Sequence, residues 1–478
     1  MGGSRQTIRI AGAWVLVLAT VTTVARAQTP RGREPDTFIQ QQQQVTRDIW
    51  ERAEQEAPVA RRVGFEYGGW YSFHLFLWDD GINSSRTYRR NDLRVWSRLT
   101  LDGGAHEFYA RGLLSYLDFN SGDSYGGKDN DWEGMNLERG YYEFNLARAL
   151  KTYRNQTLDS NFRLKVGRDL VKLGTGYALW TPMDHVRVVA NLHDFEITGL
   201  VGQSVKSTPD FDRSRPITES DRAFFAAQVR YLGIRQHEPF AYVLWQRDHN
   251  QDTFWALGRE FDYDSFYVGL GSQGELVRNL WYSTEWVYES GRGHNGRRVC
   301  TDSVIKAWAF DAQLEYLFDT PMEPRASLEY MFASGDPDRV GSPTDSAGGN
   351  RLRDPVDRGF NGFGFRDTGL SFAPQLGNVH IWRAGTSFCP VKDKPLLYRL
   401  ELGTNWFLYH KSRREAAVSD PTADQQSGYL GWEMDYFANW EITPDLMWTT
   451  RYGLFFPGDA FSDRTTRTYF LVGMTWSF

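Results

Sequence analysis

The sequence is poor in cysteine and has no long hydrophobic run beyond its first 27 residues. Only two cysteines occur, Cys300 and Cys389, and the strand pattern described below places them at opposite ends of the molecule. Because a disulfide requires Cα atoms within about 7 Å of each other, we expect two free thiols. No apolar run of about 18 residues follows the N-terminal segment, which excludes membrane-spanning helices. The mean hydropathy is accordingly low, at −0.53.

The N-terminus has the pattern of a secretory signal peptide. Arg5 and Arg9 precede an apolar stretch at 10–24, and the small-x-small sequence at 25–27 is typical of a cleavage site. We therefore predict a signal peptide at 1–27. Its removal takes away three arginines and no acidic residue, so the formal net charge changes from −6 to −9. Residues 28–63 would form a periplasmic N-terminal extension, either a short helix or a disordered segment.

What the chain has in abundance is aromatic side chains, with 18 Trp and 24 Tyr. Both residues favour membrane–water interfaces. The last nine residues carry Phe470, Val472, Met474, Trp476 and Phe478 at every second position. A period of two with one apolar face is typical of a strand that faces lipid. The sequence thus predicts an all-β protein, a transmembrane antiparallel β-barrel in the cell outer membrane of a Gram-negative bacterium.

Residues 64–478 divide into segments of about 10 to 16 residues, bounded by Gly, Asp, Asn and Pro. Alternation of apolar and polar residues is clearest at 93–101 and 308–316. The alternative is a barrel of sixteen strands, which would result if residues 161–191 were assigned differently. The eighteen predicted strands are 65–78, 90–101, 106–118, 136–149, 161–173, 178–191, 195–205, 222–233, 238–248, 262–271, 277–289, 305–318, 324–334, 378–389, 396–409, 428–440, 445–456 and 466–478.

The connections alternate in length, as expected for short periplasmic turns and long extracellular loops. One long connection, 150–160, is assigned to the periplasm. The short turns are predicted at 102–105, 193–194, 234–237, 319–322, 390–395 and 441–444. The long loops are predicted at 119–135, 206–221, 249–261, 290–304, 335–377 and 410–427.

The inward side chains determine what such a barrel does, because a barrel of about eighteen strands has an interior wide enough for water and solute. Inward basic residues are predicted at Arg94, Arg98, Arg111, Arg139, Arg163, Lys165, Arg187, Arg230, Arg383, Arg399 and Arg451. Inward acids are predicted at Glu143, Glu285, Glu289, Asp311, Glu315, Glu329, Glu401, Glu433 and Asp435. Two interpretations are open. Either the charges pair across strands, or their uneven distribution forms a positive wall facing a negative one or a basic constriction that selects anions.

Two sets of short motifs resemble the alginate-export family of outer-membrane porins. The first is Leu-Lys-Val-Gly-Arg at 164–168, followed by Gly174 and by Asp-His-Val-Arg-Val at 184–188. The second is Ala-Ser-Gly-Asp at 333–336, which opens a long loop, with Phe372 and Gly-Asn-Val-His at 377–380 closing it.

The resemblance implies an eighteen-stranded barrel that exports an anionic polysaccharide through an arginine-lined lumen gated by loops. It also implies that Arg168 and Arg187 are lumen arginines, although Arg168 breaks the alternation with Arg163 and Lys165. The chain departs from the family pattern at Asp169, where Gln is expected, and in the 28–63 extension.

The sequence gives little support for an enzymatic function. The chain has no Gly-x-Ser-x-Gly elbow and no histidine–serine constellation around His74, His106, His185, His193 or His380. We therefore expect no enzyme, no catalytic residues and no cofactor. The acidic segments 118–131 and 335–377 are either solvated loops or Ca²⁺ sites. The length of 335–377 also indicates a loop that folds inward and narrows the pore.

The sequence thus predicts a monomeric channel for an anionic polysaccharide such as alginate, or for another organic anion. Its partners would be this substrate, the bilayer and periplasmic secretion proteins, without nucleic acid. The alternatives are a sealed barrel that binds surface or capsule polysaccharide, and a general diffusion porin.

Overall fold

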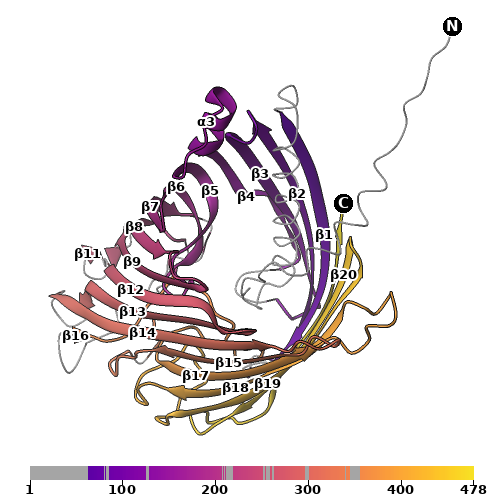
Figure 1. Cartoon of the computed structure of the whole chain (residues 1–478). Helices are drawn as coiled ribbons and strands as arrows, with labels where there is room; N and C mark the ends of the chain where they lie inside the picture. The colour runs from indigo at the N-terminus through magenta and orange to yellow at the C-terminus, as the bar shows by residue number, and fades with distance from the viewer. Residues whose placement is uncertain are drawn as a thin grey trace.

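The computed structural model describes residues 63–79, 81, 85–124, 129–206, 208, 210–211, 219–250, 253–254, 259–260, 263–295, 301–339, 341–344 and 356–478. Eighteen long strands form one closed antiparallel barrel (Figure 1). They are β1 (Gly64–Trp78), β2 (Arg86–Leu101), β3 (His106–Phe119), β4 (Asp131–Asn145), β5 (Asn161–Lys172), β6 (Trp180–Leu192), β7 (Phe195–Ser204), β8 (Arg222–Tyr231), β9 (His237–Asp248), β12 (Asp264–Val277), β13 (Leu280–Asn295), β14 (Thr301–Leu317), β15 (Arg325–Ala333), β17 (Val379–Phe388), β18 (Leu400–Lys411), β19 (Tyr429–Thr443), β20 (Leu446–Pro457) and β21 (Arg467–Ser477).

Each strand pairs with its neighbour in the chain, and β1 pairs with β21 to close the barrel. Figure 1 shows the indigo first strand beside the yellow C-terminal strands. Gly69 and Phe478 exchange two backbone hydrogen bonds of 3.0 Å, so the chain ends within the closing ladder. The predicted antiparallel barrel of eighteen strands is confirmed, and the sixteen-stranded alternative is wrong.

Three further strands are only two residues long. β10 (Thr253–Phe254) and β11 (Arg259–Glu260) pair with each other outside the barrel sheet. β16 (Val356–Asp357) lies parallel to the start of β14. None of the three adds a strand to the barrel wall.

A helix replaces the end of one predicted strand. The strand predicted at 136–149 ends at Asn145, where α3 (Leu146–Arg154) begins. The Asn145 side chain accepts a hydrogen bond from the Arg148 N–H, which caps the helix. Leu, Ala, Arg and Lys within the segment are strong helix formers. The predicted 150–160 turn is therefore half helix. No helix in the described ranges is long and apolar enough to cross a bilayer.

The ladder between β4 and β5 is the shortest in the wall. It joins only six residue pairs, from Gly140–Arg168 to Asn145–Arg163. Above it, the 131–139 part of β4 pairs only with β3 among the described strands. The reason is that β5 and β6, at the ends joined by residues 173–179, bend away from β4 toward the lumen.

The two faces of the wall differ as the alternation predicted. On β14, Trp308 and Leu314 point outward and are 44% and 41% exposed, whereas Asp311 points inward and is 1% exposed. Apolar side chains thus face lipid, and many charged ones are buried inside. The largest apolar cluster, including Leu173, Phe360 and Phe455, also lies inside, between the wall and the loops that enter the barrel.

Some predictions fall on residues outside the described ranges. Residues 1–62 are among these, so the signal peptide and the 28–63 extension stay predictions. Cys300 also lies outside the described ranges, whereas Cys389 is a free, partly buried cysteine just after β17. The Cys389 N–H donates to the carbonyl of Met322 in the facing turn at the same end of the barrel.

The assignment of the two faces can be tested at adjacent positions of β14. We expect Leu314→Arg to destabilise the barrel by about 2–4 kcal/mol if the residue lies at mid-bilayer, and less near the interface. Gln313→Arg, one residue away on the inward face, should cost much less. Urea unfolding of both variants in lipid vesicles measures the difference. Equal losses would contradict the register.

Candidate functional site

The lumen is the candidate functional site, and two loops enter it. The first is 173–179, between β5 and β6, where every residue is buried. Its turn uses Gly174 and Gly176, whose φ angles of 54° and 91° favour glycine. The Thr175 N–H donates to Glu285 on β13 at 2.6 Å, and the Tyr177 hydroxyl donates to the Phe332 carbonyl on β15 at 2.9 Å. The loop therefore crosses to the opposite wall.

The second loop, 334–378, is anchored by the residues of the second motif. Carboxylate oxygens of Asp336 accept hydrogen bonds from the N–H groups of Asp338 at 2.9 Å and Arg358 at 2.8 Å. At the other end, Asn378 has a φ of 57°, and its side chain accepts from the Arg413 N–H at 2.7 Å. The motif thus fixes the base of the loop.

Buried glutamates of the wall hold the backbone of this second loop. Glu433 on β19 accepts hydrogen bonds from three consecutive N–H groups, those of Leu370 at 2.6 Å, Ser371 at 2.6 Å and Phe372 at 2.9 Å. Glu289 on β13 accepts from the Asn361 N–H at 2.9 Å. Carboxylates that accept several backbone N–H groups make strong, charge-assisted contacts.

Arginines complete the attachment. Arg366 of the loop forms an ion pair with Asp311 at 2.8 Å and donates to the Thr175 carbonyl at 3.2 Å, which joins the two loops. Burial disfavours the charged form of Arg366, but Asp311 and other nearby carboxylates outweigh this effect, so the pKa of Arg366 is raised. Arg383 on β17 pairs with Asp367 of the loop at 3.3 Å. The described residues of the 335–377 segment therefore fold inward, as the length of the segment indicated.

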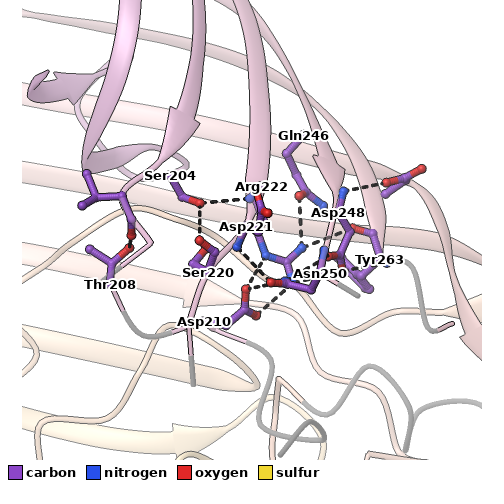
Figure 2. Close-up of polar contacts among 12 residues, drawn as sticks. Ser204, Thr208, Asp210, Ser220, Asp221, Arg222, Gln246, Asp248, Asn250 and Tyr263 are labelled. Atoms are coloured by element: carbon purple, nitrogen blue, oxygen red, sulfur yellow. Dashed lines mark hydrogen bonds and ion pairs between the residues drawn. The ribbon is translucent and has the colours of Figure 1, made fainter. Parts of the chain in front are cut away.

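A third segment, around Asp210 and Phe211, contacts the second loop, and Figure 2 shows the polar cluster around Arg222 that holds it. Arg222, at the start of β8, is fully buried and pairs with Asp210 at 2.7 Å and Asp248 at 3.2 Å. This cluster holds Phe211, whose ring packs edge-on against Phe363 of the second loop at 5.1 Å between centroids. This cluster was not predicted, because residues 206–221 were expected only to form a loop.

These contacts change the interpretation of the acidic half of the barrel. Glu285, Glu289, Asp311, Glu329 and Glu433 are each at most 6% exposed. They point inward as predicted, but they lie beneath the two loops. They therefore do not form an acidic wall facing the basic one.

The basic half shows the predicted pairing across strands. Ten of the twelve cations predicted to line the lumen form ion pairs with carboxylates. The pairs are Arg94 with Asp92 and Glu138, Arg98 with Glu66 and Glu107, Arg111 with Glu138, Arg139 with Asp169, Arg163 with Glu196, Lys165 with Glu143 and Asp169, Arg168 with Asp184, Arg230 with Glu238, Arg383 with Glu329 and Asp367, and Arg399 with Glu441.

Arg187 is the exception on the inward face. It stands directly opposite Lys165 in the β5–β6 ladder, and no described residue forms an ion pair or a side-chain hydrogen bond with it. The remaining nominated residue, Arg451, donates to the Asn439 side chain at 2.7 Å and to backbone carbonyls. Arg187 therefore keeps its charge available.

Lys172 was not predicted. It is the last residue of β5, it is exposed, and its ammonium group lies 5.2 Å from the ring centre of Trp180. The charged groups around it include Arg366, Glu285 and Arg230, which are all inside the barrel. No carboxylate in the described residues forms an ion pair with it. The glycines of 173–179 were the signal that could have indicated this inward bend.

The lumen assignment of Arg168 is wrong. Arg168 lies three residues from the inward Lys165 and so has the opposite orientation. It forms two parallel hydrogen bonds of 2.8 Å with Asp184, directly opposite on β6. Their neighbours Val166 and Val186 are 41% and 44% exposed on the outer face. The first motif thus places one ion pair outside the barrel and one cation, Arg187, inside.

Asp169, at the position where the sequence departs from the family pattern, points inward. It forms ion pairs with Lys165 at 3.1 Å and with Arg139 at 3.6 Å. This carboxylate partly neutralises the basic wall. No group of three or more potential metal ligands occurs in the described part of the chain.

Comparison with known proteins agrees with this architecture. The family model described as "Alginate export" matches residues 152–473. No curated protein sequence matches the chain significantly.

Similar solved structures include outer-membrane porins of Pseudomonas. OccK11 (OpdR) of Pseudomonas aeruginosa has a TM-score of 0.51 at 13% identity, covering 87% of this chain and 96% of that chain. OccK2 (OpdF) of the same organism, solved in complex with glucuronate, has a TM-score of 0.51 at 13% identity, covering 87% and 98%. A BenF-like porin from Pseudomonas fluorescens has a TM-score of 0.52 at 10% identity, also covering 87% and 98%. At these identities the similarity shows the fold.

The attachment of the second loop can be tested at Glu433. Glu433→Ala removes the acceptor of three N–H groups, each costing about 1–3 kcal/mol if left unpaired. We expect the 370–372 segment to loosen and the single-channel conductance in a planar bilayer to rise. Glu315→Ala is the matched control, because no described loop residue donates to this inward carboxylate. Unchanged conductance in Glu433→Ala would show that this segment does not restrict the lumen.

Proposed function

This outer-membrane β-barrel channel belongs to the alginate-export family, and we propose that it conducts an anionic polysaccharide such as alginate. The observation that carries the proposal is the uneven use of charge inside the barrel. Acids of the C-terminal half bind loops, whereas Arg187 on the inner face of β6 and Lys172 at the end of β5, beside the inward loop 173–179, form no ion pair with a described carboxylate.

The cations on this side lie at successive heights of the wall. Arg163 is near the start of β5, Lys165 and Arg187 face each other above it, and Lys172 ends the strand. At a rise of about 3.3 Å per residue, the distance from 163 to 172 is roughly 30 Å. A polymer with a carboxylate on each sugar could therefore contact several of these cations at once.

Partial neutralisation favours passage over tight binding. Conduction requires sites that attract the substrate and still release it to the next site. Lys165 forms ion pairs with Glu143 and Asp169, both at 3.1 Å. A substrate carboxylate at Lys165 competes with these acids and is held weakly. Arg187, which has no such competitor among the described residues, would be the strongest single contact.

The other nominated residues take secondary roles in this proposal. Arg94, Arg98, Arg111, Arg139, Arg383, Arg399 and Arg451 would contribute to the positive potential of the lumen rather than bind substrate individually. Transport along such a track needs no covalent step, so we propose no catalytic residue and no cofactor. This agrees with the channel family and the porin fold.

One alternative has a specific observation in its favour. Loop 173–179 and the described part of 334–378 are joined through Arg366, which also forms an ion pair with Asp311 of the wall. A barrel sealed by these loops would bind a surface polysaccharide rather than conduct it. Conductance separates the two functions.

The proposal is tested by ion selectivity in a planar bilayer with a salt gradient. We expect the wild type to prefer anions and to be blocked transiently by a purified oligouronate. Arg187→Gln should reduce the anion preference, and Arg187→Glu should abolish it. Arg168→Gln removes the same charge from the outer face and should leave selectivity unchanged.

A cation-selective wild type would contradict the proposal. A wild type without conductance, together with a conducting Glu433→Ala variant, would favour the sealed barrel.

A further inference from the structure

The helix α3 is the one helix in the described part of the chain, and it lies at the end of the barrel where the other described turns are short (Figure 1). Short turns mark the periplasmic end of outer-membrane barrels. Within α3 all charged residues are basic, namely Arg148, Lys151 and Arg154. The chain as a whole is acidic, with a net charge of −6. The helix is therefore a local basic feature on an acidic protein.

The helix is held rigidly at the rim. Asn145 caps its start, and the Thr152 hydroxyl donates to the Asp102 carbonyl at 2.9 Å. The Tyr153 hydroxyl also donates to the Asp102 carboxylate. These contacts tie α3 to the turn between β2 and β3, so its side chains have fixed positions.

Two of its cations are exposed and available. Lys151 and Arg154 lie three residues apart, on neighbouring positions of the helix surface. Both are exposed, and no described carboxylate forms an ion pair with either. Between them in sequence, Tyr153 is 57% exposed. Cations next to an exposed aromatic ring suit an acidic sugar, whose carboxylate binds the cation and whose ring stacks on the aromatic face.

Basic residues near a helix C-terminus often serve only to stabilise the helix dipole. Here the end of α3 is already capped by Asn155, whose φ is 49°. The N–H groups of Asn155 and Gln156 donate to the carbonyls of Lys151 and Leu150 at 3.0 and 3.2 Å. The helix thus has its cap without the side chains of Lys151 and Arg154.

We propose that α3 is the periplasmic landing surface for the polyanion that the channel conducts. This inference rests on the proposed function. The helix contacts β5, so its cations continue the series of Arg163, Lys165, Arg187 and Lys172 to the rim. The polymer would bind Lys151 and Arg154 first and then pass to Arg163, whose side chain is 37% exposed.

The test is the double variant Lys151→Glu with Arg154→Glu, studied in planar bilayers with a purified oligouronate. Favourable charge at a channel mouth raises association rates by at least about tenfold. We therefore expect the frequency of blockades from the periplasmic side to fall by about that factor at low salt. Blockades from the extracellular side, conductance and small-ion selectivity should not change. At ~1 M salt, where the Debye length is ~3 Å, the difference from wild type should nearly vanish.

The matched control is Arg235→Glu with Arg278→Glu, which makes the same charge change in two other periplasmic turns. An equal loss of capture in the control would overturn the proposal, because net charge at the rim would then explain the effect. Undiminished periplasmic capture in the α3 variant would also overturn it. The milder Lys151→Gln with Arg154→Gln variant gives the same comparison if the charge reversal prevents folding.

Failure of the proposed function has a different signature. In that case the wild type itself shows neither anion preference nor blockades from either side. If export in cells is lost while capture by the purified variant is intact, α3 serves a protein partner and the landing-surface proposal is wrong.

Discussion

Closure of the backbone ladder is the constraint on which the rest of this structure depends. In a bilayer, an unpaired backbone N–H or carbonyl costs several kcal/mol, so a membrane-spanning sheet must have no free edge. The pairing of β1 with β21, extended to Phe478 itself, removes that edge. Once the sheet is closed, strict alternation sends every second side chain into one shared interior. Charges that would be scattered over the surface of a soluble protein are thereby concentrated around a single axis, and each must find a partner or water.

The chain resolves this concentration of charge differently in its two halves. In the C-terminal half, carboxylates accept backbone N–H groups of the inward loops, as Glu433 does from three consecutive residues. Those carboxylates thus become attachment points rather than lumen surface. In the N-terminal half, cations and acids of adjacent strands pair within the wall, as Lys165 does with Glu143. The surplus cations of β5 and β6 remain. The electrostatic character of the lumen therefore depends on where the loops attach as much as on which residues point inward.

Strand number, the approximate position of each strand and the inward face could be predicted because each rests on local periodicity. Several bounds, such as both ends of β4 and the end of β12, nevertheless differ from the predicted ones by four to six residues. The inward positions of Arg187 and Lys165 follow from the alternation along each strand. The same alternation places Arg168 on the outer face, so the lumen position that the family resemblance implied for Arg168 was wrong. The attachment of loops could not be predicted. Thr175 binds Glu285 across the lumen, 110 residues away in sequence, and no pattern of spacing indicates such a contact. The helix α3 was missed because Leu146–Arg154 follows a strand without a break in composition, and only the cap at Asn145 distinguishes the two.

The short β4–β5 ladder gives the wall an uneven stiffness. Only six residue pairs join these strands, and two ion pairs, Glu143–Lys165 at 3.1 Å and Arg139–Asp169 at 3.6 Å, span the same junction. The side chains of both pairs are between 8% and 19% exposed, so salt screens these ion pairs only weakly. The barrel wall is therefore most easily deformed at the β4–β5 junction, where ion pairs supply part of the resistance to deformation. The circumference of the barrel thus yields most readily along this line.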